Sequence, residues 1–166
     1  TKEQLLAGLD EGMVDSPHSI FPGTDEQDYY RGLVTGAGPI GLLAALMGRQ
    51  RGLDVHVLDR HTDGPKPQLV RDLGAHYYTG DVTPLAREAD VVIECTGVGE
   101  LVFDIVRHTP PGAVTCLAGI SSGGRTIPAD FGSLNKAMVL ENDVVFGSVN
   151  ANRSHYEAGA GALAAA

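Results

Sequence analysis

Short apolar runs alternate with longer stretches of helical periodicity from Tyr30 to the end of the chain. Runs such as DVVIE and AVTCL are almost wholly apolar, as expected for strands that are buried on both faces of a parallel sheet. The predicted strands are Arg31–Thr35, Asp54–Leu58, His76–Thr79, Asp90–Cys95, Ala113–Ala118 and Val144–Gly147. The predicted helices are Pro39–Gln50, Lys66–Leu73, Pro84–Glu88, Glu100–His108, Ala129–Glu141 and a last one that begins near Asn152. This order is typical of an α/β fold with a doubly wound, six-stranded parallel sheet.

The segment before Tyr30 has no clear period. The stretch TKEQLLAGLDEG could form a short helix that is capped by Thr1 and ended by Gly12, and turn residues follow it. We therefore divide the chain into an N-terminal segment, residues 1–29, and one domain, residues 30–166.

Three glycines with the spacing G-x-G-x-x-G follow the first predicted strand. Gly36 permits a tight turn, Gly38 lets a pyrophosphate approach the backbone, and Gly41 lets the helix pack close to the strand. Pro39 loses no hydrogen bond at the first position of a helix, and the free amides of that helix favour a phosphate. Strand, glycine turn and helix in this order predict a Rossmann fold that binds a dinucleotide. The alternative is a structural turn without a ligand.

An acidic residue, Asp59, ends the second predicted strand, where a carboxylate can accept hydrogen bonds from both ribose hydroxyls of the adenosine and repel a 2′-phosphate. Arg60 beside it could instead hold that phosphate, or it could be an ordinary solvated charge. These two residues favour NAD as the cofactor without excluding NADP.

Small and polar residues follow the later predicted strands, at the sheet edge where open parallel sheets bind ligands. The candidates for contact with the nicotinamide end are Thr96, Gly97, Gly119, Ile120, Ser121, Val149 and Asn150. An ordinary strand-to-helix turn is the alternative explanation for Thr96 and Gly97, and Asn152 can serve as the cap of the last helix.

A net charge of −9 argues against binding to nucleic acid or to anionic lipid, because both need a basic surface. No apolar run is long enough to span a bilayer, so we expect a cytoplasmic protein without a membrane partner. Cys95 and Cys116 lie in apolar runs and are expected to be reduced core residues. The histidines lack metal-binding spacing, and no catalytic nucleophile pattern is present, so no metal-ligating or catalytic residue is assigned.

Three stretches, LVTGAGPIGLLAA, VVIECTGV and MVLENDVVFGSVNANRSHYEAG, resemble the nucleotide-binding domain of medium-chain, zinc-dependent dehydrogenases, and in particular the glucose 1-dehydrogenase family. The resemblance covers residues 31 to about 162. It implies that Ile40 joins the three glycines and Pro39 around the pyrophosphate and that Asp59 and Arg60 lie at the adenosine ribose. It further implies that the strand-end candidates other than Ser121 lie at the nicotinamide.

The same resemblance implies hydride transfer from C1 of an aldose to NAD(P)+ in the full enzyme, with zinc in a GroES-like catalytic domain that is not recognisable here. The chain alone is therefore expected to hold a nicotinamide dinucleotide without turnover. We also expect a small sugar as substrate of the full enzyme and a homo-oligomer. A non-catalytic NAD-sensing module, or the same domain of a polyol or threonine dehydrogenase, remains an alternative.

Overall fold

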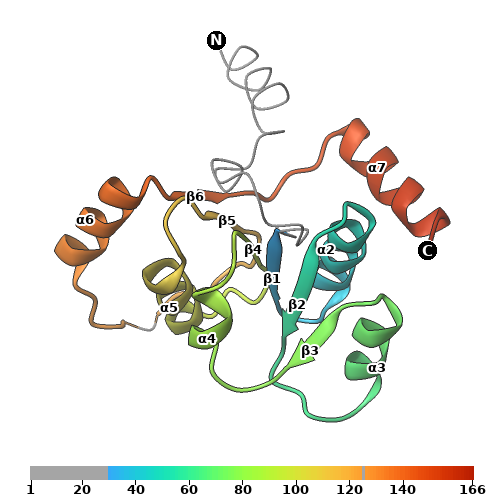
Figure 1. The fold of residues 1–166 in the computed structure, drawn as a ribbon, viewed down its shortest axis with the longest axis horizontal. Coiled ribbons are helices and arrows are strands. Elements are labelled where there is room, and N and C mark those ends of the chain that lie inside the picture. Colours follow the sequence, from blue (N-terminus) through green and yellow to red (C-terminus); the bar gives the residue numbers. More distant parts are fainter. Residues whose placement is uncertain (1–29, 125) are drawn as a thin grey trace, which may run out of the picture.

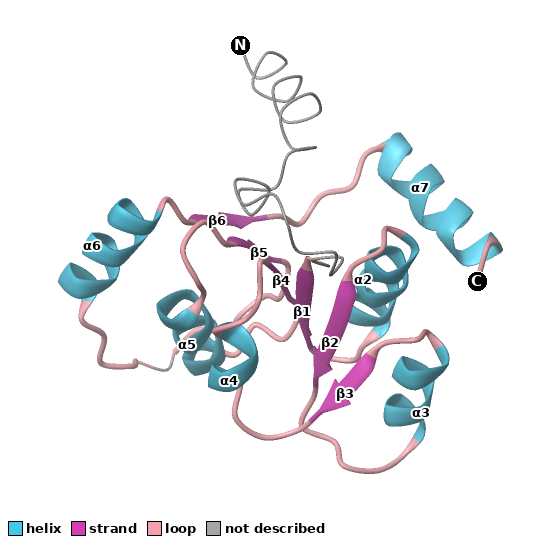
Figure 2. Ribbon diagram, in the orientation of Figure 1, coloured by secondary structure: helices cyan, strands magenta, loops and turns pink. Residues whose placement is uncertain are grey.

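The computed structural model describes residues 30–124 and 126–166, and these residues build one parallel sheet with helices on both faces (Figures 1 and 2). The strands are β1 (Arg31–Thr35), β2 (Asp54–Leu58), β3 (His76–Tyr78), β4 (Val91–Glu94), β5 (Val114–Leu117) and β6 (Val144–Gly147). The helices are α2 (Pro39–Gln50), α3 (Pro65–Asp72), α4 (Thr83–Ala86), α5 (Gly99–His108), α6 (Phe131–Glu141) and α7 (Arg153–Ala164). The strand order β3-β2-β1-β4-β5-β6 confirms the doubly wound, six-stranded parallel sheet.

Two apolar cores lie on opposite faces of the sheet, because successive side chains of a strand point to opposite sides. Leu33 of β1 packs into one core with residues of α4 and α5, and the next residue, Val34, packs into the other with residues of α2 and α3. The strands β1 and β2 are the best buried, since all but the first residue of each is buried. Within β5, by contrast, only Thr115 is fully buried, so the apolar run AVTCL is less enclosed than its sequence predicts.

Helix ends differ from the expected ends by one or two residues, for identifiable reasons. The helix expected from Ala129 begins at Phe131, because Asp130 is its N-cap and accepts a hydrogen bond from the Ser133 amide at 3.1 Å. Asn152 caps α7 as expected, and the His155 side chain accepts a hydrogen bond from the Asn152 amide. The suggested helix at the start of the chain lies outside the described residues.

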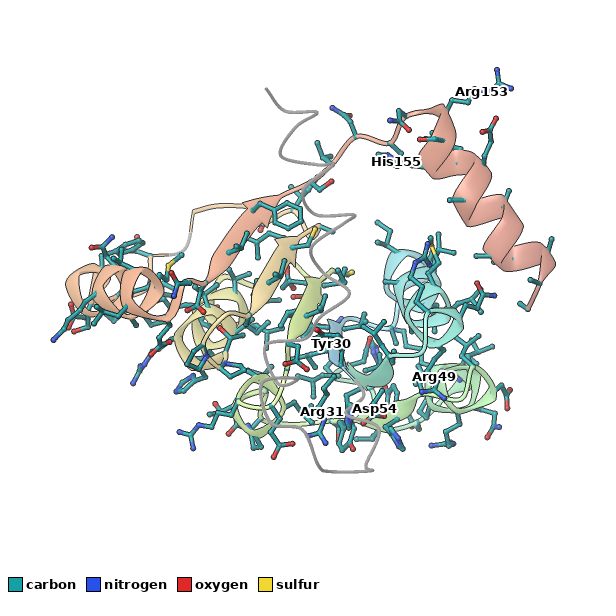
Figure 3. All side chains as sticks on the ribbon, turned by 45° about the horizontal axis from the view of Figure 1, so that its top comes forward. Tyr30, Arg31, Arg49, Asp54, Arg153 and His155 are labelled. Atoms are coloured by element: carbon teal, nitrogen blue, oxygen red, sulfur yellow. The ribbon has the colours of Figure 1, made fainter. Side chains whose placement is uncertain are left out.

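The last helix, α7, packs mainly on α2 and not on the sheet (Figure 1). Its link to the domain includes the Gln50 side chain, which donates a hydrogen bond to the Ala162 carbonyl at 2.9 Å. Arg153 and His155 mark the start of this helix in Figure 3, well apart from Arg31 and Asp54 at the opposite side of the picture. Within the described ranges, no helix has the length and apolar character that a bilayer span requires.

Candidate dinucleotide-binding site

The glycine turn between β1 and α2 has the geometry that its sequence predicts. Gly36 has a φ of +90°, a conformation that favours glycine, and its amide donates to the Leu58 carbonyl at 2.7 Å. A Cβ at Gly41 would lie 1.8 Å from the Gly36 carbonyl oxygen, so only glycine allows this approach of helix and strand. The turn is thereby held against β2 on one side and against α2 on the other.

Gly38 has a different environment, because a Cβ built there meets no other atom within 4 Å. It is the N-cap of α2 and offers no side chain to the first amides of the helix, and Pro39 follows as the first helical residue. Ile40 is 61% exposed beside it. The amino end of α2 thus faces open space with backbone donors that lack a partner within the helix, which is the arrangement that binds an anion.

Asp59, directly after β2, lies beside the glycine turn, and its side chain is only 7% exposed. One carboxylate oxygen, Oδ2, accepts hydrogen bonds from the Ala37 amide and from Lys66 Nζ, both at 2.8 Å. The other, Oδ1, accepts from the His61 amide at 3.1 Å and contacts His61 Nδ1 at 2.6 Å. The acidic residue therefore ties the glycine turn to the start of α3.

These contacts also set the protonation of Asp59. Burial alone would raise the pKa of its carboxyl group, but the hydrogen bonds from Lys66, His61 and the Ala37 amide outweigh burial and hold the pKa well below its ordinary value. Asp59 is thus a carboxylate with a lysine as its counter-ion. The preference for NAD over NADP remains a prediction. It rests on repulsion between the Asp59 carboxylate and the 2′-phosphate of NADP, and the positive charge of Lys66 reduces that repulsion.

Arg60 lies next to this group with an exposed side chain. It makes no hydrogen bond or ion pair with any residue in the described ranges. Its guanidinium is therefore available to an anion, in contrast to the Lys66 ammonium, which is bonded to Asp59.

A cavity of about 340 Å³ opens between the loops that follow β4 and β5. It is lined by Thr96, Gly97, Val98, Gly99, Glu100, Ile120, Ser121, Ser122, Gly123 and Ile127. The glycine turn borders the first of these loops, since a Cβ at Gly36 would lie 3.0 Å from Thr96 Cγ2. The structure thus brings Thr96, Gly97, Ile120 and Ser121 together at one cavity, and their contact with the nicotinamide remains a prediction.

The two loops are joined by close backbone packing. The Ser121 hydroxyl donates to the Gly97 carbonyl at 2.7 Å. A Cβ at Gly119 would lie 2.2 Å from the Gly97 nitrogen, and one at Gly97 would lie 2.5 Å from the Ile120 carbonyl. Both glycines are therefore required for the contact between the loops, a structural role that adds to the predicted one at the ligand.

Glu94, the last residue of β4, is fully buried beneath these loops. Its side chain accepts hydrogen bonds from the Thr35 hydroxyl, from the amide and hydroxyl of Thr96, and from the Gly97 amide. Glu94 was not among the site residues predicted from the sequence. The only local indication was an acidic residue at the end of the apolar run DVVIE, since its partner Thr35 lies 59 positions away in sequence.

Val149 and Asn150 do not line the cavity. Both follow β6 with exposed side chains, and Val149 is 74% exposed. Their expected contact with the cofactor therefore remains a prediction.

The described residues contain no group of three or more His, Cys, Asp and Glu side chains that could hold a metal ion. Cys95 and Cys116 are free thiols, but both are half-buried and not the fully buried core residues that were expected. Burial raises the pKa of the Cys95 thiol to about 12 and also raises the pKa of the Cys116 thiol, so neither is a reactive thiolate near neutral pH.

Residues 23–166 match the family described as "Glucose dehydrogenase C-terminus". The chain is 37% identical to glucose 1-dehydrogenase of Methanocella arvoryzae over 136 residues, which are 78% of this chain and 38% of that protein. It is 39% identical to glucose 1-dehydrogenase 1 of Caldivirga maquilingensis over 128 residues, or 76% of this chain and 36% of that protein. The chain thus spans less than half the length of these relatives.

The fold matches that of Haloferax mediterranei glucose dehydrogenase in complex with NADP, Zn and gluconolactone, with a TM-score of 0.73 and 27% identity. This match covers 84% of the chain and 42% of the solved one. Fold, glycine turn and family match agree, and the chain belongs to the glucose dehydrogenase C-terminus family.

Proposed function

We propose that this chain binds NAD(P) and is the cofactor domain of a sugar dehydrogenase. The observation that carries the proposal is the amino end of α2, where Gly38 leaves open space in front of unpaired backbone amides, between the Asp59 group and the cavity. A dinucleotide consists of adenosine, pyrophosphate and nicotinamide in that order. In the proposal these three parts lie at Asp59, at the amino end of α2 and in the cavity, respectively. Residues 30–166 form the binding unit in this proposal.

The chain's own residues bind and orient the cofactor. The turn at Gly36, Gly38 and Pro39, with Ile40 and Gly41, holds the pyrophosphate, and Asp59 and Arg60 face the adenosine ribose. Thr96, Gly97, Gly119, Ile120 and Ser121 border the nicotinamide, and Val149 and Asn150 complete that end. When bound, the nicotinamide supplies hydride transfer.

In the whole protein, the proposed reaction is oxidation of an aldose at C1. Its support is that the curated relatives above are glucose 1-dehydrogenases and that the solved Haloferax complex contains gluconolactone. The zinc of that complex has no counterpart set of ligands in the described part of this chain, so we assign it to the catalytic portion of the whole protein.

We further propose a cytoplasmic homo-oligomer. Free cysteines fit a reducing compartment. Apolar side chains on α6 and β6 are exposed, among them Phe131, Val139, Leu140 and Phe146, and such a surface is typical of contact with a second copy.

The test is a titration of the chain with NADH and with NADPH, followed by nicotinamide fluorescence, for the wild type and for Gly38→Val. Because Gly38 has extended backbone and no neighbour within 4 Å, valine leaves the fold intact and places methyl groups in the path of the pyrophosphate. We expect the variant to lose at least about 2 kcal/mol of binding free energy, or roughly 30-fold in affinity.

Gly161→Val is the matched control, since Gly161 also has no neighbour within 4 Å but lies on α7. It should bind like the wild type. Equal affinity of all three proteins would show that the cofactor does not cross Gly38.

A further inference from the structure

Glu94 is a buried acid that joins three separate parts of the cavity wall. Its carboxylate receives donors from the end of β1 through Thr35 and from the loop after β4 through Thr96 and Gly97. Its backbone carbonyl accepts from the amides of Ala118 and Gly119 at the end of β5, both at 2.8 Å. One residue thus fixes the relative positions of β1, β4 and β5 where the cavity opens.

The backbone amides of Thr96 and Gly97 can only donate to the Glu94 carboxylate, and the hydroxyls of Thr35 and Thr96 can rotate to donate as well. Oε1 accepts from the Thr35 hydroxyl at 3.2 Å, from the Thr96 amide at 2.7 Å and from the Thr96 hydroxyl, and Oε2 accepts from the Gly97 amide at 3.1 Å. Donors on all sides are the environment of an ionised carboxylate. No lysine, arginine or histidine of residues 30–124 and 126–166 forms an ion pair with it.

A glutamine would keep the acceptor at Oε1, but its NH2 group would stand where Oε2 accepts from the Gly97 amide, so the hydrogen bonds favour a carboxylate. A buried charge without a counter-ion is nevertheless expensive, and none of the described residues supplies a positive partner for it. The negative charge lies directly below Thr96 and Gly97, which line the cavity. A positively charged ring in that cavity would be stabilised by it, and a neutral ring would not.

We propose that Glu94 positions the loop at Thr96 and Gly97 and that its buried charge favours oxidised over reduced nicotinamide in the cavity. This inference rests on the proposed function, because it needs the nicotinamide to lie there. The oxidised ring carries a positive charge that the reduced ring lacks. Glu94 accordingly acts as a positioning residue and as the local counter-ion of the oxidised cofactor.

The test compares the wild type with Glu94→Gln by calorimetric titration with NADP+, NADPH and ADP-ribose, which has no nicotinamide. Glutamine keeps the Oε1 acceptor and removes the charge. We expect the ratio of the dissociation constants, reduced over oxidised, to fall about three- to tenfold in the variant, mainly through weaker NADP+ binding. The dissociation constant for ADP-ribose should stay within about twofold.

Glu157→Gln removes an exposed carboxylate on α7 and serves as the control, with an unchanged ratio. Glu94→Asp keeps the charge and shortens the side chain, so both cofactor forms should bind more weakly at an unchanged ratio. This second variant keeps the inference testable if Glu94→Gln does not fold.

An unchanged ratio in a folded Glu94→Gln, or a changed ratio in Glu94→Asp, would overturn the role of the charge. Suppose that the wild type binds ADP-ribose, and that the wild type and both Glu94 variants each bind NADP+ and NADPH with equal affinity. This result would overturn the inference and leave the proposed function standing. A wild type that binds none of the three ligands would overturn the proposed function and this inference with it.

Discussion

Replacement of Gly41 by alanine should destabilise the fold, although alanine favours helices over glycine by about 1 kcal/mol. The new Cβ would lie 1.8 Å from the Gly36 carbonyl oxygen and 3.3 Å from Val34 Cγ1. Gly36 cannot retreat easily, because its amide is bonded to the Leu58 carbonyl at 2.7 Å. The start of α2 must therefore move by roughly 1 Å to reach the 3.0 Å that a Cβ tolerates.

Overpacking of this kind costs about 1–3 kcal/mol, and a rigid backbone partner places Gly41→Ala in the upper part of that range. After the gain in helix propensity, we expect a net loss of about 2 kcal/mol of unfolding free energy. For a domain of this size, that loss lowers the melting temperature by about 4–8 °C. The chain contains no tryptophan, so urea and thermal unfolding are followed by circular dichroism.

Gly38→Ala is the matched control, because the same methyl group meets no atom within 4 Å three residues earlier. Its unfolding free energy should change by less than about 1 kcal/mol. If Gly41→Ala were as stable as Gly38→Ala, the close approach of α2 to the glycine turn would not be the reason for a glycine at position 41.

Two further predictions concern the contacts of Asp59 with Ala37, His61 and Lys66. Because the folded-state pKa of Asp59 is well below its ordinary value near 4, its contribution to stability is complete above pH 4 and declines gradually as the pH falls from 4 toward the folded-state pKa. Asp59→Asn should therefore cost about 2 kcal/mol of unfolding free energy at pH 7 and a smaller but still measurable amount at pH 3 in urea titrations, and an equal cost at both pH values would contradict the assigned bonds. Lys66→Met removes the counter-ion at 2.8 Å from Oδ2, so calorimetry should show NADP binding weakened about tenfold and NAD binding changed less than about threefold. Equal losses for the two cofactors would mean that Lys66 does not influence the choice between them.

The fold was predictable from the sequence because its signals are local. The apolar runs gave β1, β2 and β6 with their observed ends, and the glycine spacing predicted the turn at Gly36. The expected start of α6 was wrong by two residues, since the choice of Asp130 as cap depends on a side-chain hydrogen bond and not on periodicity.

The candidate site was predictable only in part, because its remaining contacts join residues that are distant in sequence. Thr35 reaches Glu94 across 59 positions, so this pair has no local pattern. Lys66 follows Asp59 by only seven positions, but its contact depends on the path of the loop between β2 and α3, which periodicity does not indicate. The glycines at 97 and 119 were correctly placed at the loops, but their contact with each other depends on the order of β4 and β5 in the sheet.

The attachment of α7 to α2 makes the last helix a separate unit of local unfolding. A helix that packs chiefly on another helix can open without breaking any strand pairing, so its amides can exchange with solvent at a lower free energy than those of β1 and β4. The hydrogen bond from Gln50 to Ala162 lies at the far end of α2 from Gly38. Opening of the last helix would therefore leave the amino end of α2, at Gly38, in place.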